Sequence, residues 1–385
     1  MARMSVLGLR ELNRTFLARQ FLVDRTCMSA LEVIRHLVAV QGQEPNWPYV
    51  GLWTRVTDFQ KEELGGLLAD RSVVRSTMLR RTVHLAAAED FRWLRPTVAP
   101  IVRSALKDAF LAEEIDGLDL DELATVGREL LSGRILPRRE LGILLAERFP
   151  GRHGGRLVNT LELMVAMTHA PAVGGWGRWG NASGIAITQA EEWIGQPMAD
   201  SPRLEAMILR YLAAFGPASV MDVQAWSGLT RLREVVDRMR PRLRVHRDGE
   251  GRELFDLPDA LLADPDQPVP VRFLPAFDNA LLGHRDRTRV IGDADRRRFA
   301  KVASGGVPMF LLDGFVQGTW SVRGSTLRIA PFQPLDRFDA TAVMEEADRL
   351  LDFIAPDDPG REIMLVTDAS EPVNRLHAGL RVPGP

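Results

Sequence analysis

One arrangement of secondary structure recurs three times along this chain: amphipathic helical patterns followed by two short extended segments. Apolar residues recur with the helical period in residues 9–22, 29–40 and 60–70, and extended segments follow at 73–79 and 81–86. Helical patterns return at 121–132, 138–148 and 156–169, and again at 202–215, 218–227 and 229–240, ahead of a strand-turn-strand segment at 243–257. Helices followed by a hairpin are the order of a winged helix, so the sequence predicts three winged-helix units in tandem.

The rest of the chain follows a different pattern. From about residue 270, extended segments alternate with helical patterns near 293–303 and 338–354, which predicts a mixed α/β region with a hairpin at Asp313-Gly314. Residues 113–122 carry six acidic side chains and no basic one, as is typical of a solvated connector. We therefore expect an α+β, mainly α, protein with its three units in a C-shaped arrangement. The expected divisions are residues 1–112, 113–200, 201–269 and 270–385.

The composition is that of a folded protein in a reducing compartment. Apolar residues make up 45% and charged residues 26% of the 385 residues, and the net charge of -2 gives no overall attraction to a polyanion. Cys27 is the single cysteine and cannot form an intrachain disulfide. The first 14 residues lack an uninterrupted apolar stretch, and no heptad repeat is present. We expect a cytoplasmic monomer that does not contact a membrane.

Several common catalytic and binding motifs are excluded. Residues 175–180 (GWGRWG) match a dinucleotide-binding pattern, but a helical pattern precedes them and no helix follows, so we interpret the glycines as turn formers that carry Trp176 and Trp179. The chain has no serine-hydrolase elbow, zinc-protease motif, phosphate-binding loop or paired-cysteine metal pattern. No metal site is therefore predicted.

Gln41-Gly42-Gln43 is a more informative segment, because it lies at the end of the helical pattern 29–40. Residues two apart do not share a face of a continuous helix. Gly42, however, can adopt the left-handed conformation that ends a helix, and the two carboxamides could then converge beyond it. From the residues alone, polar side chains that terminate a helix remain the simpler interpretation.

Six segments of the chain favour a functional interpretation of Gln41 and Gln43. They are LNRTFLARQFL, AVQGQEPNWPYVGLW, RRTVHLAAAEDFRWL, FGPASVMDVQAWSGL, FLPAFDNALLGHRDR and LLDGFVQGTW. In this order, over about 370 residues, they resemble the winged-helix family of DNA glycosylases that includes AlkZ-like and YcaQ-like enzymes. Through Gln41 and Gln43 the chain resembles the AlkZ-like branch, whose motif is glutamine, an apolar residue, glutamine. Gly42 departs from the usual middle residue.

The resemblance implies a monofunctional DNA glycosylase without a cofactor. Its substrate would be double-stranded DNA with bulky N7-alkylguanine adducts, and it would also unhook interstrand crosslinks, as self-resistance to a DNA-alkylating natural product. Alkylation at N7 makes the base a good leaving group, so two neutral carboxamides that aim a water and stabilise the developing sugar cation would suffice. Gln41 and Gln43 are the implied catalytic residues.

Other residues are candidates for lining the cleft or for binding DNA. Glu44, Trp47 and His84 could line the cleft, although Glu44 could be a solvated cap and His84 a histidine bonded to the backbone. The candidates for DNA contact are Arg80, Arg81, His284, Arg285 and Arg287. Each of the arginines could instead be an exposed charge or a member of an ion pair. The Asp313-Gly314 hairpin could probe the duplex or be an ordinary sheet turn.

Two other functions stay open from the sequence. Winged-helix units more often bind DNA than cleave it, so the chain could be a non-catalytic regulator that recognises an operator. Alternatively, it could sequester a drug or its adduct, with Trp47, Trp176 and Trp179 as stacking surfaces.

Overall fold

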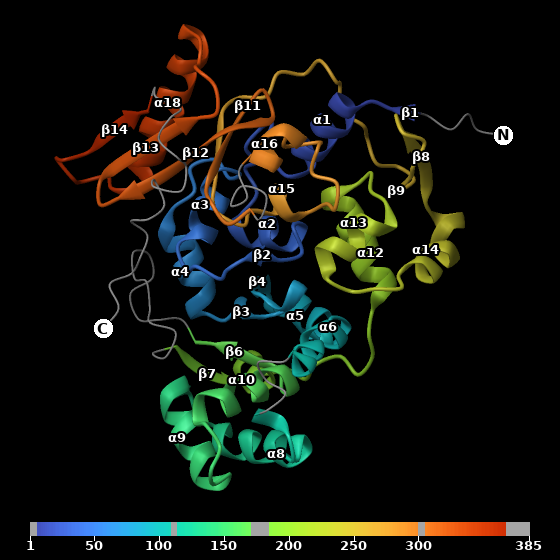
Figure 1. Cartoon of the computed structure of the whole chain (residues 1–385), viewed down its shortest axis with the longest axis vertical. Coiled ribbons are helices and arrows are strands. Elements are labelled where there is room, and N and C mark those ends of the chain that lie inside the picture. The colour runs from blue at the N-terminus through green and yellow to red at the C-terminus, as the bar shows by residue number, and fades with distance from the viewer. Residues whose placement is uncertain (1–5, 109–113, 171–184, 299–304, 367–385) are drawn as a thin grey trace.

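The computed structural model describes residues 6–108, 114–170, 185–298 and 305–366, which form an α+β protein with most of its helices in the first two thirds of the chain (Figure 1). The helices are α1 (Leu9–Arg19), α2 (Ala30–His36), α3 (Trp47–Trp53), α4 (Lys61–Ala69), α5 (Ala88–Thr97), α6 (Ala99–Ser104), α8 (Leu120–Leu131), α9 (Arg138–Arg148), α10 (Gly154–Met164), α11 (Ala190–Ile194), α12 (Leu204–Phe215), α13 (Val220–Ser227), α14 (Arg233–Met239), α15 (Asn279–Leu282), α16 (Asp293–Arg298) and α18 (Arg337–Ile354). Short 3-10 turns are η1 (Leu79–Arg81), η2 (Ala105–Lys107) and η4 (Arg240–Arg242).

The strands form three sheets. They are β1 (Val6–Leu7), β2 (Val40–Gln41), β3 (Val73–Thr77), β4 (Val83–Ala87), β5 (Leu136–Pro137), β6 (Met167–His169), β7 (Ala186–Gln189), β8 (Arg244–Asp248), β9 (Glu253–Asp256), β10 (Arg272–Leu274), β11 (Met309–Leu312), β12 (Phe315–Arg323), β13 (Thr326–Pro331) and β14 (Glu362–Leu365). Their orders are β2-β4-β3-β6-β7-β5, β1-β8-β9 and β10-β11-β12-β13-β14.

The six-stranded sheet joins two parts of the chain that the sequence separates. The β3–β4 hairpin belongs to the first expected unit and β6 and β7 to the second, and Arg75 on β3 lies opposite His169 on β6 in the antiparallel register. Helices α8, α9 and α10 pack around their own apolar cluster below this sheet (Figure 1). The sheet therefore places residues of the second unit beside the strand that carries Arg75.

The segment before Gln41 begins as predicted and ends differently. Ser29 caps α2 through a reciprocal capping box with Glu32, which explains why the helix starts there. The helix ends at His36, four residues earlier than the pattern 29–40 predicts. Val38 has a φ of 68°, and this left-handed residue redirects the chain into β2. Gln41 is therefore on a strand, not at the end of a helix.

The third helical group follows the predicted order closely. A capping box between Ser219 and Asp222 starts α13, and Gly228, with a φ of 81°, ends it. The hairpin of β8 and β9 follows α14, and a single antiparallel bridge joins Ala218 to Phe255. Strand β1 pairs with β8 in parallel, so the start of the described chain lies against this hairpin.

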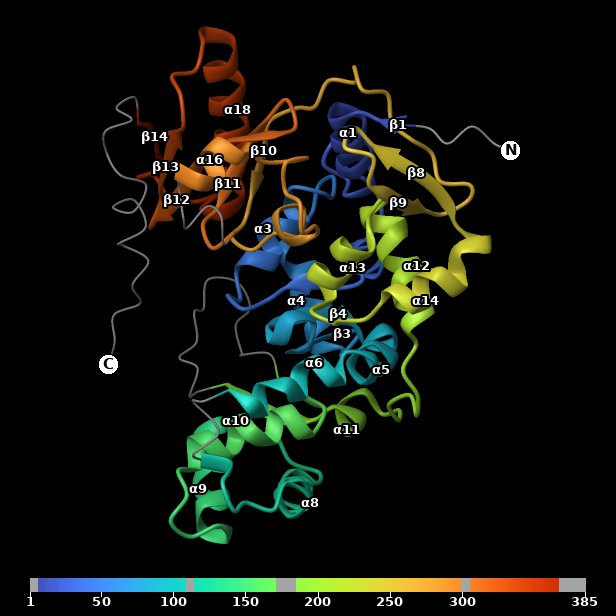
Figure 2. The same cartoon turned by 45° about the vertical axis from the view of Figure 1, so that its right-hand side comes forward.

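The C-terminal sheet packs against α18, and its turn packs against α1 (Figure 2). Asp313, at the turn between β11 and β12, forms ion pairs with Arg10 (2.8 Å) and with the buried Arg14. A Cβ at Gly314 would lie 2.6 Å from the guanidinium of Arg14. The Asp313-Gly314 hairpin is thus an ordinary sheet turn fixed to α1, and this removes the idea that it probes the duplex.

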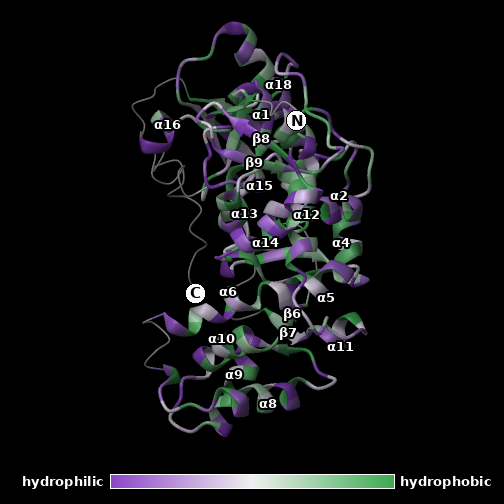
Figure 3. Ribbon diagram, turned by 90° about the vertical axis from the view of Figure 1, so that its right-hand side faces the viewer, coloured by the Kyte–Doolittle hydropathy of each residue, from purple (hydrophilic) through white to green (hydrophobic). Residues whose placement is uncertain are grey.

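Figure 3 shows α18 and the group α8–α10 at opposite ends of an elongated molecule. The largest buried side chains include Trp226, Trp320 and Phe215. In the described part of the chain, no helix is long and apolar enough to cross a bilayer.

Candidate active site

The carboxamide oxygens of Gln41 and Gln43 accept from two adjacent residues at the start of β4, Thr82 and Val83. Gln41 lies opposite His84 in the β2–β4 pair, and the Gly42 amide donates to the Val83 carbonyl at 2.9 Å. The ladder then changes, because the Val83 amide donates to Gln43 Oε1 at 3.2 Å. Both glutamine oxygens therefore accept hydrogen bonds from consecutive residues, since the Thr82 hydroxyl donates to Gln41 Oε1 at 3.2 Å.

Hydrogen bonds to the adjacent residues Thr82 and Val83, and not a left-handed glycine, bring these two side chains together. Gly42 is absent from the residues with positive φ among those described, so the predicted helix stop at Gly42 is wrong. Strand β2 ends at Gln41, and the carbonyls of both Gly42 and Gln43 accept from Arg75, so the backbone bends at residues 42–43. Position 42 faces Leu85, to which a Cβ would come within 3.4 Å.

The pair spans the boundary between the interior and solvent. Gln41 is 7% exposed, whereas Gln43 and the following Glu44 are exposed. A buried carboxamide held by Thr82 and an exposed one held by Val83 can present polar groups to a molecule that approaches this edge of the sheet. Glu44 lies near Arg75, and its charge opposes the effect of burial on the pKa of that guanidinium.

Arg75 is a site residue that the sequence analysis missed. It is half-buried in the centre of β3, and its Nε and Nη2 donate to the carbonyls of Gly42 (2.9 Å) and Gln43 (3.2 Å). Burial lowers its pKa to about 10, so the side chain remains a cation at neutral pH. The sequence signal for this residue was a single arginine in a strand, 73–77, whose other residues are valine, serine and threonine.

His84 and Trp47 do not line an open surface. His84 is buried and its Nδ1 lies 2.9 Å from the Thr82 carbonyl, which fits the alternative of a histidine bonded to the backbone. Burial, with Arg80 nearby, lowers the pKa of His84 to about 3, so it is neutral. Trp47 is 7% exposed and packs edge-to-face on Trp320 with ring centroids 5.7 Å apart. It is a core residue, which removes it as a cleft-lining or stacking surface.

Arg80 and Arg81 form the turn between β3 and β4, and both have positive φ values, of 52° and 63°. Arg80 is half-buried and donates to the carbonyl of Trp226, at the end of α13, and its guanidinium lies 3.3 Å from His84 Nε2. Arg81 is exposed and pairs with Asp108 at 2.7 Å. Arg80 thus fixes this turn to α13, and Arg81 is the more accessible of the two.

The HRDR segment is divided between the core and the surface. His284 is buried against Phe16, and burial lowers its pKa to about 3, so the prediction that it contacts DNA is wrong. Arg285 is exposed, and Arg287 is half-buried beside Arg80, whose pKa its charge helps to lower. The structure therefore brings Arg287 next to the turn that carries Arg80 and Arg81.

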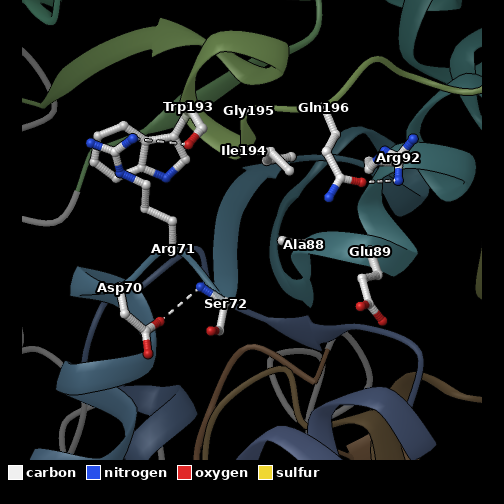
Figure 4. A pocket seen from close by; sticks show the side chains of 10 residues that line it. All are labelled: Asp70, Arg71, Ser72, Ala88, Glu89, Arg92, Trp193, Ile194, Gly195 and Gln196. Atoms are coloured by element: carbon white, nitrogen blue, oxygen red, sulfur yellow. Dashed lines mark hydrogen bonds between the residues drawn. The ribbon is translucent and has the colours of Figure 1, made fainter.

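A separate cavity of about 240 Å³ lies at the opposite end of the β3–β4 hairpin from the glutamines (Figure 4). Its lining includes Ser72, Ala88 and the Arg71 guanidinium, which stacks 4.4 Å from the Trp193 ring centroid. Among the described residues, no group of three His, Cys, Asp or Glu side chains is placed to hold a metal ion. Trp176 and Trp179 lie outside the described residues.

Comparison with known proteins gives one consistent result. The family model for the AlkZ-like DNA glycosylases matches residues 34–353. An interstrand DNA cross-link repair glycosylase from Streptomyces sahachiroi is 28% identical over 354 residues, which cover 86% of this chain and 92% of that protein. The solved structure of the Streptomyces sahachiroi DNA glycosylase AlkZ has a TM-score of 0.77 at 24% identity and covers 94% of this chain and 100% of its own, which shows a common fold. The chain therefore belongs to the AlkZ-like family of DNA glycosylases.

Proposed function

We propose that this DNA glycosylase hydrolyses the N-glycosidic bond of bulky N7-alkylguanines in duplex DNA and unhooks interstrand crosslinks made through such bases. The crosslink-repair relative supports the substrate class. Self-resistance to a DNA-alkylating natural product is the role that this substrate suggests. The observation that carries the proposal is the convergence of the Gln41 and Gln43 carboxamides on Thr82 and Val83.

The lesion itself supplies much of the reactivity. When the bond between C1′ and N9 breaks, its electron pair neutralises the positive charge of the N7-alkylated base, so no strong acid is required. The oxygen of a water forms the new bond at C1′, and its proton is released to solvent. The enzyme has to place this water and to stabilise the positive charge that develops on the sugar.

The two glutamines can perform both tasks while their protein hydrogen bonds remain. A carboxamide oxygen has two lone pairs, so Gln41 Oε1 and Gln43 Oε1 can each accept a second hydrogen bond, from the water. Their partial negative charge faces the developing sugar cation. Because an amide is a poor base, their role is to position the water rather than to remove its proton.

In this proposal, winged-helix units in the divisions 1–112, 113–200 and 201–269 bind the duplex, and residues 270–385 form a supporting region. The order α12, α13, α14, β8, β9 supports this for the third unit. Around α14, Arg231, Arg238 and Arg244 are exposed, and none of them forms an ion pair with a carboxylate of the described residues. An open surface also suits a crosslinked base, which cannot be flipped fully out of the duplex.

Duplex DNA with one defined bulky N7-alkylguanine tests the function. Incubation with the enzyme should release the free alkylated base and leave an abasic site. Release of neither, from both small and bulky adducts, would contradict the proposal. A sequestering protein would protect DNA without free base, and a regulator would protect one operator sequence from nuclease even when both glutamines are replaced by alanine. In the same experiments, size measurement with and without DNA tests the proposed monomer.

A further inference from the structure

We propose that Arg75 is a positioning residue that holds the Gln41-Gly42-Gln43 segment in its reactive geometry, and that His169 and Glu162 of the second unit hold Arg75. This inference rests on the function proposed above, because it gives a role to the same edge of the sheet. Neither Arg75 nor its partners reach the reacting atoms in this account, and they act through the glutamines.

The guanidinium of Arg75 uses its three nitrogens on three different acceptors. Nε donates to the Gly42 carbonyl at 2.9 Å, Nη2 donates to the Gln43 carbonyl at 3.2 Å, and Nη1 lies 2.8 Å from His169 Nδ1. A planar fork with fixed donor directions can bind two successive carbonyls and a third group at once. A lysine ammonium at this position could not reproduce these three directions.

The sheet holds this segment through the Gly42 amide, which donates to the Val83 carbonyl at 2.9 Å, but not through the Gly42 carbonyl. In a continued antiparallel ladder the Gly42 carbonyl would accept from the Val83 amide. The Val83 amide instead donates to the Gln43 side chain, and Arg75 takes the Gly42 carbonyl. The Gln43 carboxamide thus takes the place of the Gly42 carbonyl at the Val83 amide, and Arg75 becomes the donor to that carbonyl. This exchange of hydrogen-bond partners fixes both the backbone at residues 42–43 and the Gln43 carboxamide. Removal of the fork leaves the carbonyls of Gly42 and Gln43 without these donors, so that the Gly42 amide is the remaining backbone link to β4 and residues 42–43 can shift.

Arg75 is itself held from the second unit. His169 lies directly opposite Arg75 in the β3–β6 pair, and its Nε2 is 3.4 Å from Glu162 Oε1. Glu162 also pairs with Arg138, which donates to Asn159 at 2.6 Å. Because Nδ1 accepts from Arg75, the ring proton is on Nε2 and points to Glu162. Burial lowers the pKa of His169, which favours this neutral form.

The first test compares R75K with the control variant R71K. Both substitutions keep the positive charge and remove the planar guanidinium. Arg71 lies at the same junction of the two units, where it stacks on Trp193 and donates to its carbonyl, but at the opposite end of the β3–β4 hairpin from residues 41–43. We expect R75K to lower the single-turnover rate of base release 10- to 100-fold, as a displacement of about 1 Å can do, with affinity for lesion DNA within about twofold. R71K should keep the wild-type rate.

Hydrogen exchange at the Val83 amide gives a readout that does not depend on activity. This amide donates to Gln43 Oε1, so it reports the position of the carboxamide. It should exchange faster in R75K than in the wild type and should be unchanged in R71K. Thermal unfolding of both variants checks that the fold is intact.

A second pair of variants tests the link to the second unit. In H169N the side-chain oxygen takes the place of Nδ1 and can still accept from Arg75, whereas in H169Q the carboxamide takes the place of Nε2 and leaves Arg75 without this acceptor. We expect H169N to retain an intermediate rate and H169Q to resemble R75K.

The outcomes separate this inference from the proposed function. Wild-type base release in R75K would overturn the positioning role. So would a loss confined to DNA affinity with unchanged Val83 exchange, because Arg75 would then be a DNA contact. If the wild type releases no base but Val83 exchange rises in R75K, the proposed function fails and the structural role of Arg75 stands.

Discussion

At the scale of single residues, the most important feature is that the Gln43 side chain replaces a backbone carbonyl as the hydrogen-bond acceptor of the Val83 amide. Gln43 Oε1 occupies the place at the Val83 amide that a strand carbonyl would take, while Arg75 occupies that carbonyl. The identities of Gln41 and Gln43 could be predicted from the sequence through the family resemblance. Their geometry could not, because the left-handed residue is Val38, a β-branched residue for which local preferences argue against positive φ.

The observed backbone makes Gly42 replaceable. A Cβ at this position would meet Leu85 at 3.4 Å and the His84 carbonyl carbon at 3.5 Å, which are ordinary contacts, and the φ is not positive. We expect G42A to keep base release within about threefold and to raise the free energy of unfolding by up to about 1 kcal/mol, since alanine reduces the entropy of the unfolded chain. Urea unfolding and single-turnover assays measure this. A tenfold loss of activity would favour a left-handed residue 42.

Two buried histidines predict how the free energy of unfolding depends on pH below neutrality. Burial lowers the pKa values of His84 and His284 from 6.5 to about 3. Between these values the unfolded chain binds the protons and the folded chain does not. The free energy of unfolding should therefore fall as pH falls from about 6.5 to 3, by on the order of 1 kcal/mol per pH unit for each histidine. Urea unfolding at several pH values should show a shallower slope in H84N, and an identical slope would contradict this.

At the scale of elements, several helices are predicted well and sheet partners are not; the helical pattern 156–169 extends past the end of α10 at Met164 and covers strand β6. Periodicity placed α9, α12 and α18 within about two residues of their observed ends, because each has one buried face. The pairing of β3 with β6 joins residues far apart in sequence, and no local pattern specifies it. The sheet that brings His169 to Arg75 could therefore be found only in the structure.

The arginines around α14 give an element-scale prediction. If the third unit contacts phosphates, the triple variant R231A/R238A/R244A should bind duplex DNA more weakly, with a salt slope smaller by up to about 3, while base release from the bound complex is unchanged. The matched control is E234Q on the same exposed face, which removes a negative charge and should strengthen binding. Titrations at several salt concentrations measure both. An unchanged slope in the triple variant would exclude this helix from the DNA interface.

At the scale of the whole molecule, ion pairs between distant segments join the N-terminal helices to the C-terminal region. Arg55 binds both oxygens of Asp278, at 2.9 and 2.7 Å, and the two side chains are 2% and 4% exposed. Arg25 likewise pairs with the buried Glu346 of α18 at 2.6 Å, and Arg272 and Arg349 of the C-terminal region also contact this carboxylate. Charge counts along the sequence cannot show these pairs, because partners such as Arg55 and Asp278 are 223 residues apart.

Removal of one partner from a buried pair should destabilise the whole molecule. D278A leaves the guanidinium of Arg55 buried without its carboxylate, and it also removes the cap that accepts from the Ala280 amide. We expect the free energy of unfolding to fall by about 3–5 kcal/mol. E89A, which breaks the exposed pair with Arg35, should change it by less than about 1 kcal/mol. Equal effects in chemical denaturation would contradict the assigned role of the buried pair.

The most direct test of the account is the single-turnover rate of base release from N7-alkylguanine DNA by Q41A, Q43A and the double variant. If the two carboxamides position one water together, each single variant should lose at least tenfold in rate with DNA affinity preserved, and the double variant should be little slower than the slower single variant. Wild-type rates in both single variants, with the fold intact, would contradict the account.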